Sequence, residues 1–590
     1  MVKKIIYRTL IFVPLLLLTV FWTMPKRMTG DIVYVPVADS MGGNDRWADS
    51  VMKTMTADER IGQLLMLELS GKVKPGDAAL KNMEADIDSC HIGGVIFFYG
   101  GPAREAALIN RLQARSKIPL MIAQDGEWGL SMRLDSVPVF PRNLALGAIV
   151  DDGIIYELGR EIGRECRRLG VNIDFMPCVD IYDNQANTVI ANRSFGANPV
   201  NVARKGCAMM QGMRDEGVLT TAKHFPGHGN TDVDSHEALP VINNTRARLD
   251  TFELFPFKHL IKNGAQGVMV GHLFVPALET NKTKVPSSIS KNVVSGLLKG
   301  ELGYEGLVFT DALAMKGVST ADNPGEVAVR AFEAGVDVLL MPPDGKKAYS
   351  ALVAARDAGR ISQKEIDKRC RKILKAKATM GLDDYKPIVV KNIYEDLNTM
   401  YAERLNSRIF ENAVTLVSNN NNVLPLRAMD NVKIAVVSIG KDAESTEFED
   451  IIGRFAKVDE YKISKAASEA AFNTLAAKLI GYDVVVVGFH GGNAYPPNFG
   501  TTLAMCKFVD GIAARQKVVL DVFTSPLALG KFAKYGELSA IVISYDDSQT
   551  AREVSAKMVM GGLPFVGRLP VGVGIFAEGA GIGTMKITLE

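Results

Sequence analysis

The segment from Lys223 to His236 gathers side chains that can transfer protons. It holds three of the seven histidines of this 590-residue chain, interleaved with carboxylates and glycines. Imidazole is the side chain suited to proton transfer near neutral pH, and this local density is far above an even spread along the chain. We therefore predict that the segment is an active-site loop.

The elements that must position this loop follow from an alternation of helical patterns with short apolar runs, which begins near residue 45. The runs are rich in β-branched residues, which is typical of βα units around a parallel sheet. About seven or eight such units precede residue 385, so a (β/α)8 TIM-like barrel is expected. The strands predicted there include Gly94–Phe98, Pro119–Ala123, Ile173–Pro177, Val218–Ala222, Gly267–Val270, Leu307–Thr310 and Val336–Met341.

In such a barrel, the residues just after the strands point into the active site. The positions that follow the predicted strands are Asp125, Asp180, Lys223, His224, His272, Asp311 and Pro342. Charges spread at random would fall at both ends of the strands. Here Asp125, Lys223, His224 and Asp311 all follow carboxyl ends, which favours a functional role for them.

A second α/β layer is predicted after the barrel. The basic helical stretch Asp367–Met380 ends at Gly381, and Pro387 follows, which signals a helix stop and an extended linker. Another helical stretch covers residues 402–418. Apolar runs then return and predict buried parallel strands. These are Val432–Val437, Val484–Val487, Val518–Phe523 and Ala540–Ile543.

The predicted fold class is therefore α/β, with a (β/α)8 TIM-like barrel followed by a smaller open α/β sandwich domain. The N-terminus is basic and continues into an apolar run shorter than the ~20 residues of a spanning helix, which indicates an export signal or an N-terminal anchor. The protein is thus expected to be exported, and to be periplasmic or membrane-anchored facing the periplasm. The expected parts are a leader (1–30), a catalytic barrel (45–385), a linker (386–412) and a C-terminal sandwich domain (413–590).

Composition narrows the classes of function. Hydrophobic residues make up 47% and charged residues 23% of the chain, as in globular proteins. The formal net charge of +2 gives no support for a nucleic-acid partner. Membrane contact is expected only through the N-terminal anchor. The six cysteines show no paired spacing, and most of them are predicted to be buried thiols.

Several motifs resemble glycoside hydrolase family 3, in particular its β-N-acetylglucosaminidase branch. The strongest is Lys223–Gly229 followed by Asp234-Ser235-His236. Other matches fall in the family's order along the chain, so the resemblance covers nearly everything from residue 45 onward. They are Met55–Leu64, Asp125–Arg133, Asn192–Gly196, Thr310–Met315 and, at the end of the second domain, Gly562–Val571.

The resemblance implies a retaining, exo-acting β-N-acetylhexosaminidase that hydrolyses terminal GlcNAc from glycans or peptidoglycan fragments through a covalent glycosyl-enzyme intermediate. Asp311 matches the family's nucleophile. The chemistry agrees, because an ionised carboxylate at a strand end can attack the anomeric carbon. An N-cap for a helix starting at Ala312 is the alternative role. His236 matches the acid/base. Its partner Asp234 can accept from one ring nitrogen and favour the imidazolium.

The resemblance also implies one acceptor and four donors around a single sugar ring. The acceptor is Asp125, and the donors are Arg133, Arg193, Lys223 and His224. A carbohydrate substrate is implied, without a metal or organic cofactor. The chain departs from the family's usual residues at Gly126, Trp128 and Asn192, which bears on substrate preference more than on reaction type. Trp128 could stack on a sugar face or pack in the protein.

Three alternatives stay open at this point. The histidines and aspartates of the loop (His224, His228, His236, Asp232, Asp234) are of the types that bind zinc, although they lack the HExxH spacing. An inactive glycan-binding protein would keep the fold, because function resides in sites. Within the family, a β-glucosidase or β-xylosidase would usually take its acid/base glutamate from the second domain.

Overall fold

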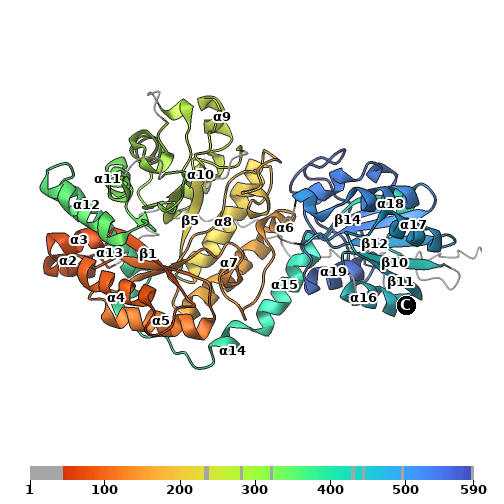
Figure 1. Ribbon diagram of the computed structural model, residues 1–590, viewed down its shortest axis with the longest axis horizontal. Coiled ribbons are helices and arrows are strands. Elements are labelled where there is room, and N and C mark those ends of the chain that lie inside the picture. The colour runs from red at the N-terminus through yellow and green to blue at the C-terminus, as the bar shows by residue number, and fades with distance from the viewer. Residues whose placement is uncertain are drawn as a thin grey trace, which may run out of the picture. The chain divides into compact units, whose positions relative to one another are not determined.

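The computed structural model describes residues 44–231, 238–279, 284–318, 323–426, 432–441, 446–492 and 497–586. Eight strands form its first sheet (Figure 1). Every neighbouring pair is parallel, in the order β7-β6-β5-β4-β3-β2-β1-β8. The strands are β1 (Leu65–Ser70), β2 (Gly94–Phe98), β3 (Met121–Gln124), β4 (Ile173–Asp174), β5 (Leu219–Phe225), β6 (Gly267–Val270), β7 (Leu307–Thr310) and β8 (Leu339–Leu340).

The two ends of this sheet meet. β8 pairs with β1, and a parallel bridge joins Phe309 of β7 to Val338, just before β8. The Thr310 N–H also donates to the Val338 carbonyl. The predicted TIM-like barrel is therefore confirmed.

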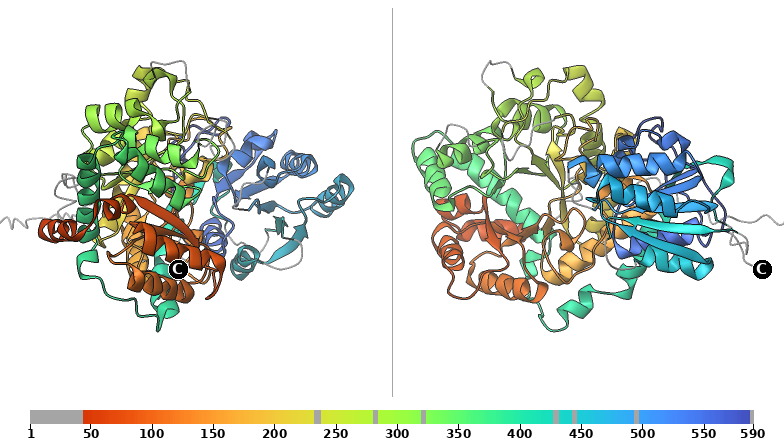
Figure 2. Two further views of the ribbon diagram at one scale, coloured as in Figure 1. Left: turned by 60° about the vertical axis from the view of Figure 1, so that its left-hand side comes forward. Right: turned by 45° about the vertical axis from the view of Figure 1, so that its right-hand side comes forward.

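Helices cover the outside of the strands (Figures 1 and 2). Between successive strands run α4 (Ala78–Cys90), α5 (Pro102–Arg115), α7 (Asp152–Leu169), α8 (Pro199–Asp215), α10 (Phe255–Lys262), a π-helix (Asn292–Glu301) and α11 (Pro324–Ala334), and α12 (Gly345–Asp357) and α13 (Gln363–Thr379) follow β8. The strands between them are almost entirely buried, as expected for a parallel sheet covered by helices.

Beyond shifts of one to three residues at the ends of β3, β4 and β8, the sequence prediction and the barrel differ at two strands. β1 was not among the predicted strands, because Glu68 interrupts its apolar run and is exposed while its neighbours are buried. β5 runs three residues beyond the predicted end at Ala222. Lys223 and His224 therefore lie within β5, close to its carboxyl end, rather than in the loop after it.

The second sheet has six strands in the order β11-β10-β12-β13-β14-β9. Its core is parallel, as predicted, but β9 pairs antiparallel with β14. The helix expected over 402–418 ends at Ala413, because the chain turns into β9. The strands are β9 (Thr415–Asn419), β10 (Ile434–Ile439), β11 (Val458–Ile463), β12 (Val484–Phe489), β13 (Lys517–Val522) and β14 (Ala540–Ile543).

Helices lie on both faces of this second sheet, which gives the predicted sandwich (Figure 1). On one face lie α16 (Glu447–Phe455) and α19 (Gln549–Val559), and on the other lie α17 (Glu469–Lys478) and α18 (Leu503–Ala513). The stretch 386–412 is partly helical. It contains α14 (Ile393–Leu397) and most of α15 (Met400–Ala413).

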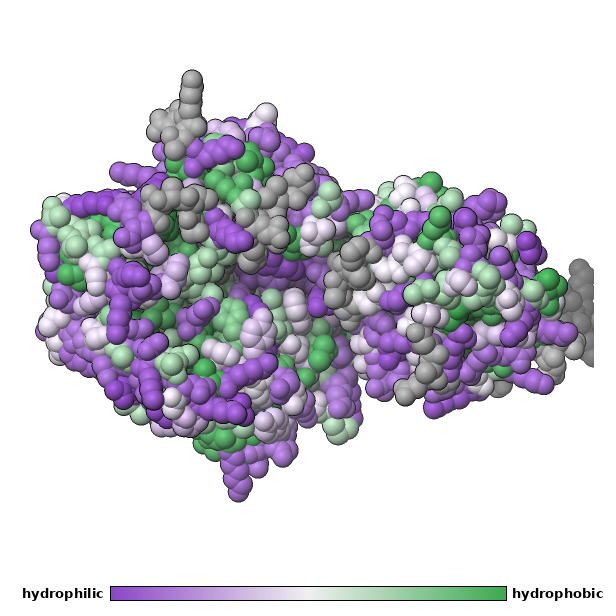
Figure 3. Space-filling model, viewed as in Figure 1, coloured by the Kyte–Doolittle hydropathy of each residue, from purple (hydrophilic) through white to green (hydrophobic). Residues whose placement is uncertain are grey.

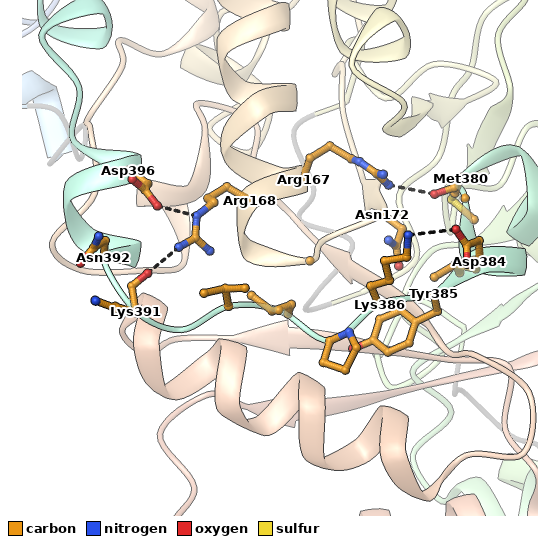
Figure 4. Close-up of a pocket in the computed structure, with 16 residues that line it drawn as sticks. Arg167, Arg168, Asn172, Met380, Asp384, Tyr385, Lys386, Lys391, Asn392 and Asp396 are labelled. Atoms are coloured by element: carbon orange, nitrogen blue, oxygen red, sulfur yellow. Dashed lines mark hydrogen bonds and ion pairs between the residues drawn. The ribbon is translucent and has the colours of Figure 1, made fainter.

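The segment that leaves the barrel, residues 380–396, is hydrogen-bonded to the C-terminal end of α7 and lines a pocket there (Figure 4). Arg167 donates to the Met380 carbonyl at 2.8 Å, and Arg168 donates to Asp396 at 2.9 Å and to the Lys391 carbonyl at 3.0 Å. This end of α7 lies at the amino ends of the strands, since β4 begins four residues later. The pocket is therefore on the face that usually serves stability, away from the strand ends that carry the candidate site.

The expected leader, residues 1–30, lies outside the described residues. None of the helices that the structure describes is both long and apolar enough to cross a membrane. All six cysteines are buried and unpaired, as predicted. In the view of Figure 3, the barrel part is hollowed at its centre, and the visible floor of the hollow is hydrophilic.

Candidate active site

The predicted site residues that the structure describes lie at the carboxyl ends of the barrel strands or in the loops that follow them. Asp125 directly follows β3, Asp311 directly follows β7, and Lys223 and His224 lie near the end of β5. Arg193 ends a short 3-10 helix, Ala191–Arg193, in the loop after β4. Loops on a rigid barrel can thus present charged groups from distant parts of the sequence to one point.

Asp125 is held by two cations. Its Oδ1 lies 3.0 Å from the Lys223 ammonium, and its Oδ2 accepts from the Arg133 guanidinium at 2.9 Å. Burial by itself would raise the pKa of Asp125, but Lys223 and Arg133 outweigh that effect and lower it. Asp125 is therefore an ionised acceptor, suited to bind hydroxyl groups of a sugar.

Glu127 is a buried carboxylate that joins two of the predicted donors. It accepts from Arg193 at distances of 2.7 to 3.2 Å and lies 2.9 Å from the Lys223 ammonium. Its side chain is fully buried, which disfavours the charged form, yet Arg193 and Lys223 hold its pKa far below the usual range. Lys223 in turn has a raised pKa, because Asp125 and Glu127 outweigh its burial. The site is thus a charge network of alternating sign.

His224 is oriented by a buried aspartate. Its Nδ1 lies 2.7 Å from Asp180, and its Nε2 lies 3.2 Å from the Arg193 guanidinium. A guanidinium only donates, so Nε2 must accept, and the proton of the neutral ring is on Nδ1. Asp180 also accepts from the backbone N–H of His228 at 2.6 Å. Burial would raise the pKa of Asp180, but His224 lowers it to about 2.

Asp311 stands apart from this network but within its electrostatic influence. Its Oδ1 accepts from the Ala312 N–H at 2.8 Å. Among the residues that the structure describes, no hydrogen bond reaches its Oδ2. Burial raises the pKa of Asp311, but His272, His224 and the Ala312 N–H together lower it more. An ionised carboxylate with one uncommitted oxygen can act as a nucleophile.

The alternative role of Asp311 as a helix cap does not fit the structure. Residues 312–318 form turns rather than a helix. Their backbone is tied to neighbouring strands, since the Leu313 N–H donates to the Leu340 carbonyl. Asp311 therefore has no helix to cap.

The other half of the predicted dyad, Asp234 and His236, lies outside the described residues, as does Asp232. His228 is described and is buried, and burial lowers its pKa to about 4. Cys178, Asp180 and His224 are close enough to share an ion. Their polar atoms, however, already bind each other, and Nε2 of His224 faces a cation, Arg193. This geometry favours hydrogen bonding over metal ligation.

Trp128, left undecided by the sequence, has one ring face occupied. The Arg142 guanidinium lies over the indole ring, 4.5 Å from its centroid. Such a contact orients the ring through the attraction between the cation and the aromatic face. Stacking of a sugar on that same face would require Arg142 to move.

Two buried carboxyl groups with raised pKa values support the Asp125 segment. Asp174, the last residue of β4, accepts from the Gly126 N–H at 2.8 Å, and Glu105 of α5 accepts from the Gln124 side chain. Both are fully buried, and burial raises the pKa of Asp174 to about 7 and that of Glu105 to about 8. Their hydrogen bonds flank Asp125 in sequence and fix the backbone on both of its sides.

Glu105 should make the protein less stable as the pH rises. Its pKa is raised from 4.5 to about 8, so between these values the unfolded chain is ionised while the folded protein still holds the proton. Folding then takes up a proton, and stability is lost as the pH climbs through this window. Glutamine cannot ionise. As the pH rises through this window, the free energy of unfolding of Glu105→Gln should therefore increase relative to that of the wild type, by about 1.4 kcal/mol for each pKa unit of the true shift.

The measurement is urea unfolding of both proteins between pH 5 and pH 9. The control is Glu403→Gln, which removes an exposed carboxylate of α15. The difference in free energy of unfolding between this control and the wild type should stay constant over this pH range. A constant difference for Glu105→Gln as well would show that Glu105 is ionised in the folded protein.

Comparison with known proteins identifies the family. A family profile described as "Glycosyl hydrolase family 3 N terminal domain" matches residues 56–376. The β-hexosaminidase A of Pseudoalteromonas piscicida is 33% identical over 429 residues, which cover 66% of this chain and 71% of that protein. The chain belongs to glycosyl hydrolase family 3. It is a glycoside hydrolase, and the resemblance noted in the sequence is confirmed.

Solved structures agree with this family assignment. A family 3 β-N-acetylglucosaminidase from Paenibacillus sp. str. FPU-7 is 31% identical, with a TM-score of 0.74, over 89% of this chain and 99% of that chain. A β-glucosidase from Listeria innocua has the same TM-score over 89% of this chain and 76% of its own, at 21% identity. The second likeness bears on the fold alone.

Sequence reasoning gave no role to several residues of this family 3 site. Glu127 was noted only as part of a motif, and Asp180 and His272 only as residues that follow strands. Glu105 and Asp174 were not singled out. A signal was present for Asp180 and His272, since both stand at carboxyl ends of predicted strands. None was present for Glu105, which comes from a helix on the outside of the barrel.

Proposed function

We propose that this family 3 enzyme is a retaining, exo-acting β-N-acetylhexosaminidase that removes terminal GlcNAc from glycans or peptidoglycan fragments. The observation that carries the proposal is Asp311. It is an ionised carboxylate at a barrel strand end, beside a network that can hold a sugar ring, and none of the residues that the structure describes forms a hydrogen bond to its Oδ2. A carboxylate so placed suits a double displacement through a covalent intermediate.

In the first step, Asp311 Oδ2 bonds to the anomeric carbon while the bond to the leaving oxygen breaks. We assign His236 as the acid that gives its proton to that oxygen, with Asp234 favouring the imidazolium. In the second step, His236 takes a proton from water, whose oxygen attacks the anomeric carbon and releases Asp311. Asp125, Arg133, Arg193 and Lys223 hold the sugar hydroxyls throughout. His224, which was expected to donate to the sugar, instead orients Arg193, since its Nε2 accepts from that residue.

Support for an N-acetylated substrate comes from relatives above 30% identity. The Pseudoalteromonas protein is named a β-hexosaminidase, and the Paenibacillus structure is that of a β-N-acetylglucosaminidase. The solved β-glucosidases that resemble the chain are near 20% identical and carry no argument about substrate. We therefore extend the N-acetyl preference, and not the glucoside preference, to this protein.

The experiment is release of 4-nitrophenol from the β-N-acetylglucosaminide and from the β-glucoside. The wild type should prefer the N-acetyl substrate by about 100-fold or more in kcat/KM, because a site that binds a polar group discriminates strongly against a substrate without it. A preference for the glucoside would overturn the proposal in favour of a β-glucosidase of the same family.

His236→Ala gives a second arm of the same experiment. Loss of a general acid typically costs about 100-fold to 10,000-fold with a poor leaving group, and much less with an acidic phenol. The variant should therefore be far more impaired on a GlcNAc disaccharide than on the nitrophenyl substrate. If the variant lost activity equally on both substrates, His236 would not be the acid/base.

A further inference from the structure

His272 is a buried histidine that the mechanism above does not use. It lies two residues after the end of β6, and β6 pairs with β7, the strand that Asp311 follows. The two strand ends are joined directly, since the Asp311 N–H donates to the Val270 carbonyl at 2.9 Å. His272 is 0% exposed, so its ring is shielded from solvent.

Both nitrogens of the His272 ring are engaged. Nε2 lies 2.9 Å from the Ala312 carbonyl oxygen, and Nδ1 lies 2.7 Å from the Ser288 hydroxyl. A carbonyl can only accept, so Nε2 carries a proton and donates to Ala312. The ring is therefore fixed in orientation and aimed at the residue that follows Asp311.

Ala312 is the residue through which the nucleophile is held. Its N–H donates to Asp311 Oδ1, and its carbonyl accepts from His272. The next N–H, of Leu313, donates to the Leu340 carbonyl at the end of β8. The peptide between Ala312 and Leu313 is thus held at its oxygen by His272, just after β6, and at its nitrogen by the Leu340 carbonyl of β8. These contacts fix Ala312 on its carboxyl side, and they thereby restrict the direction of its own N–H, which belongs to the preceding peptide and meets the carboxylate.

Ser288 is itself anchored, so the support behind His272 is rigid. It lies in a 3-10 helix, Ser287–Ile289, and is 0% exposed. The preceding Ser287 donates to the Leu273 carbonyl through both its backbone N–H and its hydroxyl, each at 2.7 Å. The short helix is thereby tied to the residue after His272. A buried chain of satisfied hydrogen bonds runs from Ser288 through His272 to Ala312.

We infer that His272 is a positioning residue for the glycosylation step: by holding the Ala312 carbonyl, it directs the Ala312 N–H to Oδ1 of Asp311 and leaves Oδ2 aimed at the anomeric carbon. The inference rests on the proposed role of Asp311 as nucleophile. His272 touches neither the substrate nor the reacting oxygen in this scheme. Its effect passes through the backbone of Ala312.

The inference predicts a defect in turnover rather than in substrate binding. His272→Leu leaves the Ala312 carbonyl without its donor, so the carboxylate loses its fixed angle. A misplaced reacting group can cost about 100-fold, so kcat should fall by about 10-fold to 100-fold with KM changed by less than about threefold. His272→Gln supplies an amide donor of similar reach, and its kcat should recover to within about fivefold of the wild type.

The test combines steady-state kinetics with covalent trapping. An activated 5-fluoro glycosyl fluoride of the N-acetylglucosamine series forms the glycosyl-enzyme and slows its hydrolysis, so intact mass gives the trapping rate. Trapping should slow in proportion to kcat in His272→Leu and recover in His272→Gln. Ser288→Ala should show a milder loss, since it removes only the support behind the ring. Thermal unfolding of each variant reports the folded fraction.

The pH profile of kcat/KM separates a change at Asp311 from a loss of folded protein. The groups that lower the pKa of Asp311 against its burial are His272, His224, the Ala312 N–H and Lys223. Removing His272 and weakening the Ala312 hydrogen bond should both raise the pKa of Asp311 and move the acidic limb of the profile to higher pH. Loss of folded protein alone would lower the whole profile without moving that limb.

A matched control is His259→Gln, because His259 lies on the outer helix α10, away from the strand ends. It should trap and turn over like the wild type. If the wild type is trapped on Asp311 and His272→Leu matches it in kcat and acidic limb, only the inference about His272 is overturned. If the wild type is not trapped on Asp311, the proposed function is overturned and the inference with it.

Discussion

Replacing Asp311 by alanine should lower kcat by about 10,000-fold or more, because removal of a catalytic nucleophile abolishes the covalent route. The residual activity should be rescued by azide. A small anion can occupy the space of the missing carboxylate and attack the anomeric carbon from the same face. The product of a retaining enzyme would then be the α-glycosyl azide. Product configuration by NMR, together with kcat with and without azide, measures both parts of the prediction.

Asp344→Ala is the matched control for this experiment. Asp344 caps α12 by accepting from the Lys347 N–H, which is the role the structure denies to Asp311. Loss of such a cap should cost about 1 kcal/mol in stability and leave turnover unchanged. If Asp311→Ala behaves like Asp344→Ala, or if azide gives only the β product, Asp311 is not the nucleophile.

Replacing Glu127 by glutamine should destabilise the protein by about 3 to 5 kcal/mol, because removing one partner of a buried ion pair leaves the other charge uncompensated. Two cations, Arg193 and Lys223, depend on this carboxylate, and its side chain is fully buried. Activity should fall by about 100-fold as well, since both donors lose their fixed positions. Urea unfolding and kcat/KM measure the two effects separately.

The stability loss of Glu127→Gln should also depend on pH in a defined direction. The pKa of Glu127 is lowered in the folded protein, so its contribution is present above the pKa of the unfolded chain and is lost as the pH falls toward the folded value. The difference between wild type and variant should therefore be constant from pH 6 to pH 9. The difference in stability should become smaller below about pH 4, where Glu127 of the unfolded chain is already protonated.

A double-mutant cycle with Arg193→Gln separates charge from position. With both charges of the pair removed, stability should partly return while activity stays low, giving a coupling energy of about 1.5 kcal/mol or more. The surface control is Glu216→Gln. Its partner Arg160 is 54% exposed, so the loss should stay below about 1 kcal/mol. Additive effects of Glu127→Gln and Arg193→Gln would show that the two residues do not act as a pair.

Much of this protein was predictable from local sequence. The alternation of helical and apolar runs gave the barrel and the second α/β layer, because a strand buried on both faces must be apolar along its length. The glycine- and histidine-rich motif, with Asp311 and Asp125 after predicted strands, gave the family. Asp125, Arg133, Arg193, Lys223 and His224 are indeed gathered at one end of the barrel. Strand β1 was not predicted for a local reason too, since Glu68 interrupts its apolar run.

Which partner each charge takes was decided only by the tertiary structure. Nothing in the spacing of Glu127 and Arg193, 66 residues apart, says that they bind each other, or that Asp180 fixes the tautomer of His224. The same holds for the neutral state of Glu105 and for the contact of His272 with Ala312. Residue types and their order specify which groups reach the strand ends. Distances, burial and the resulting pKa values exist only once the barrel brings those ends together, because electrostatic and hydrogen-bond energies depend on separation and on exclusion of water.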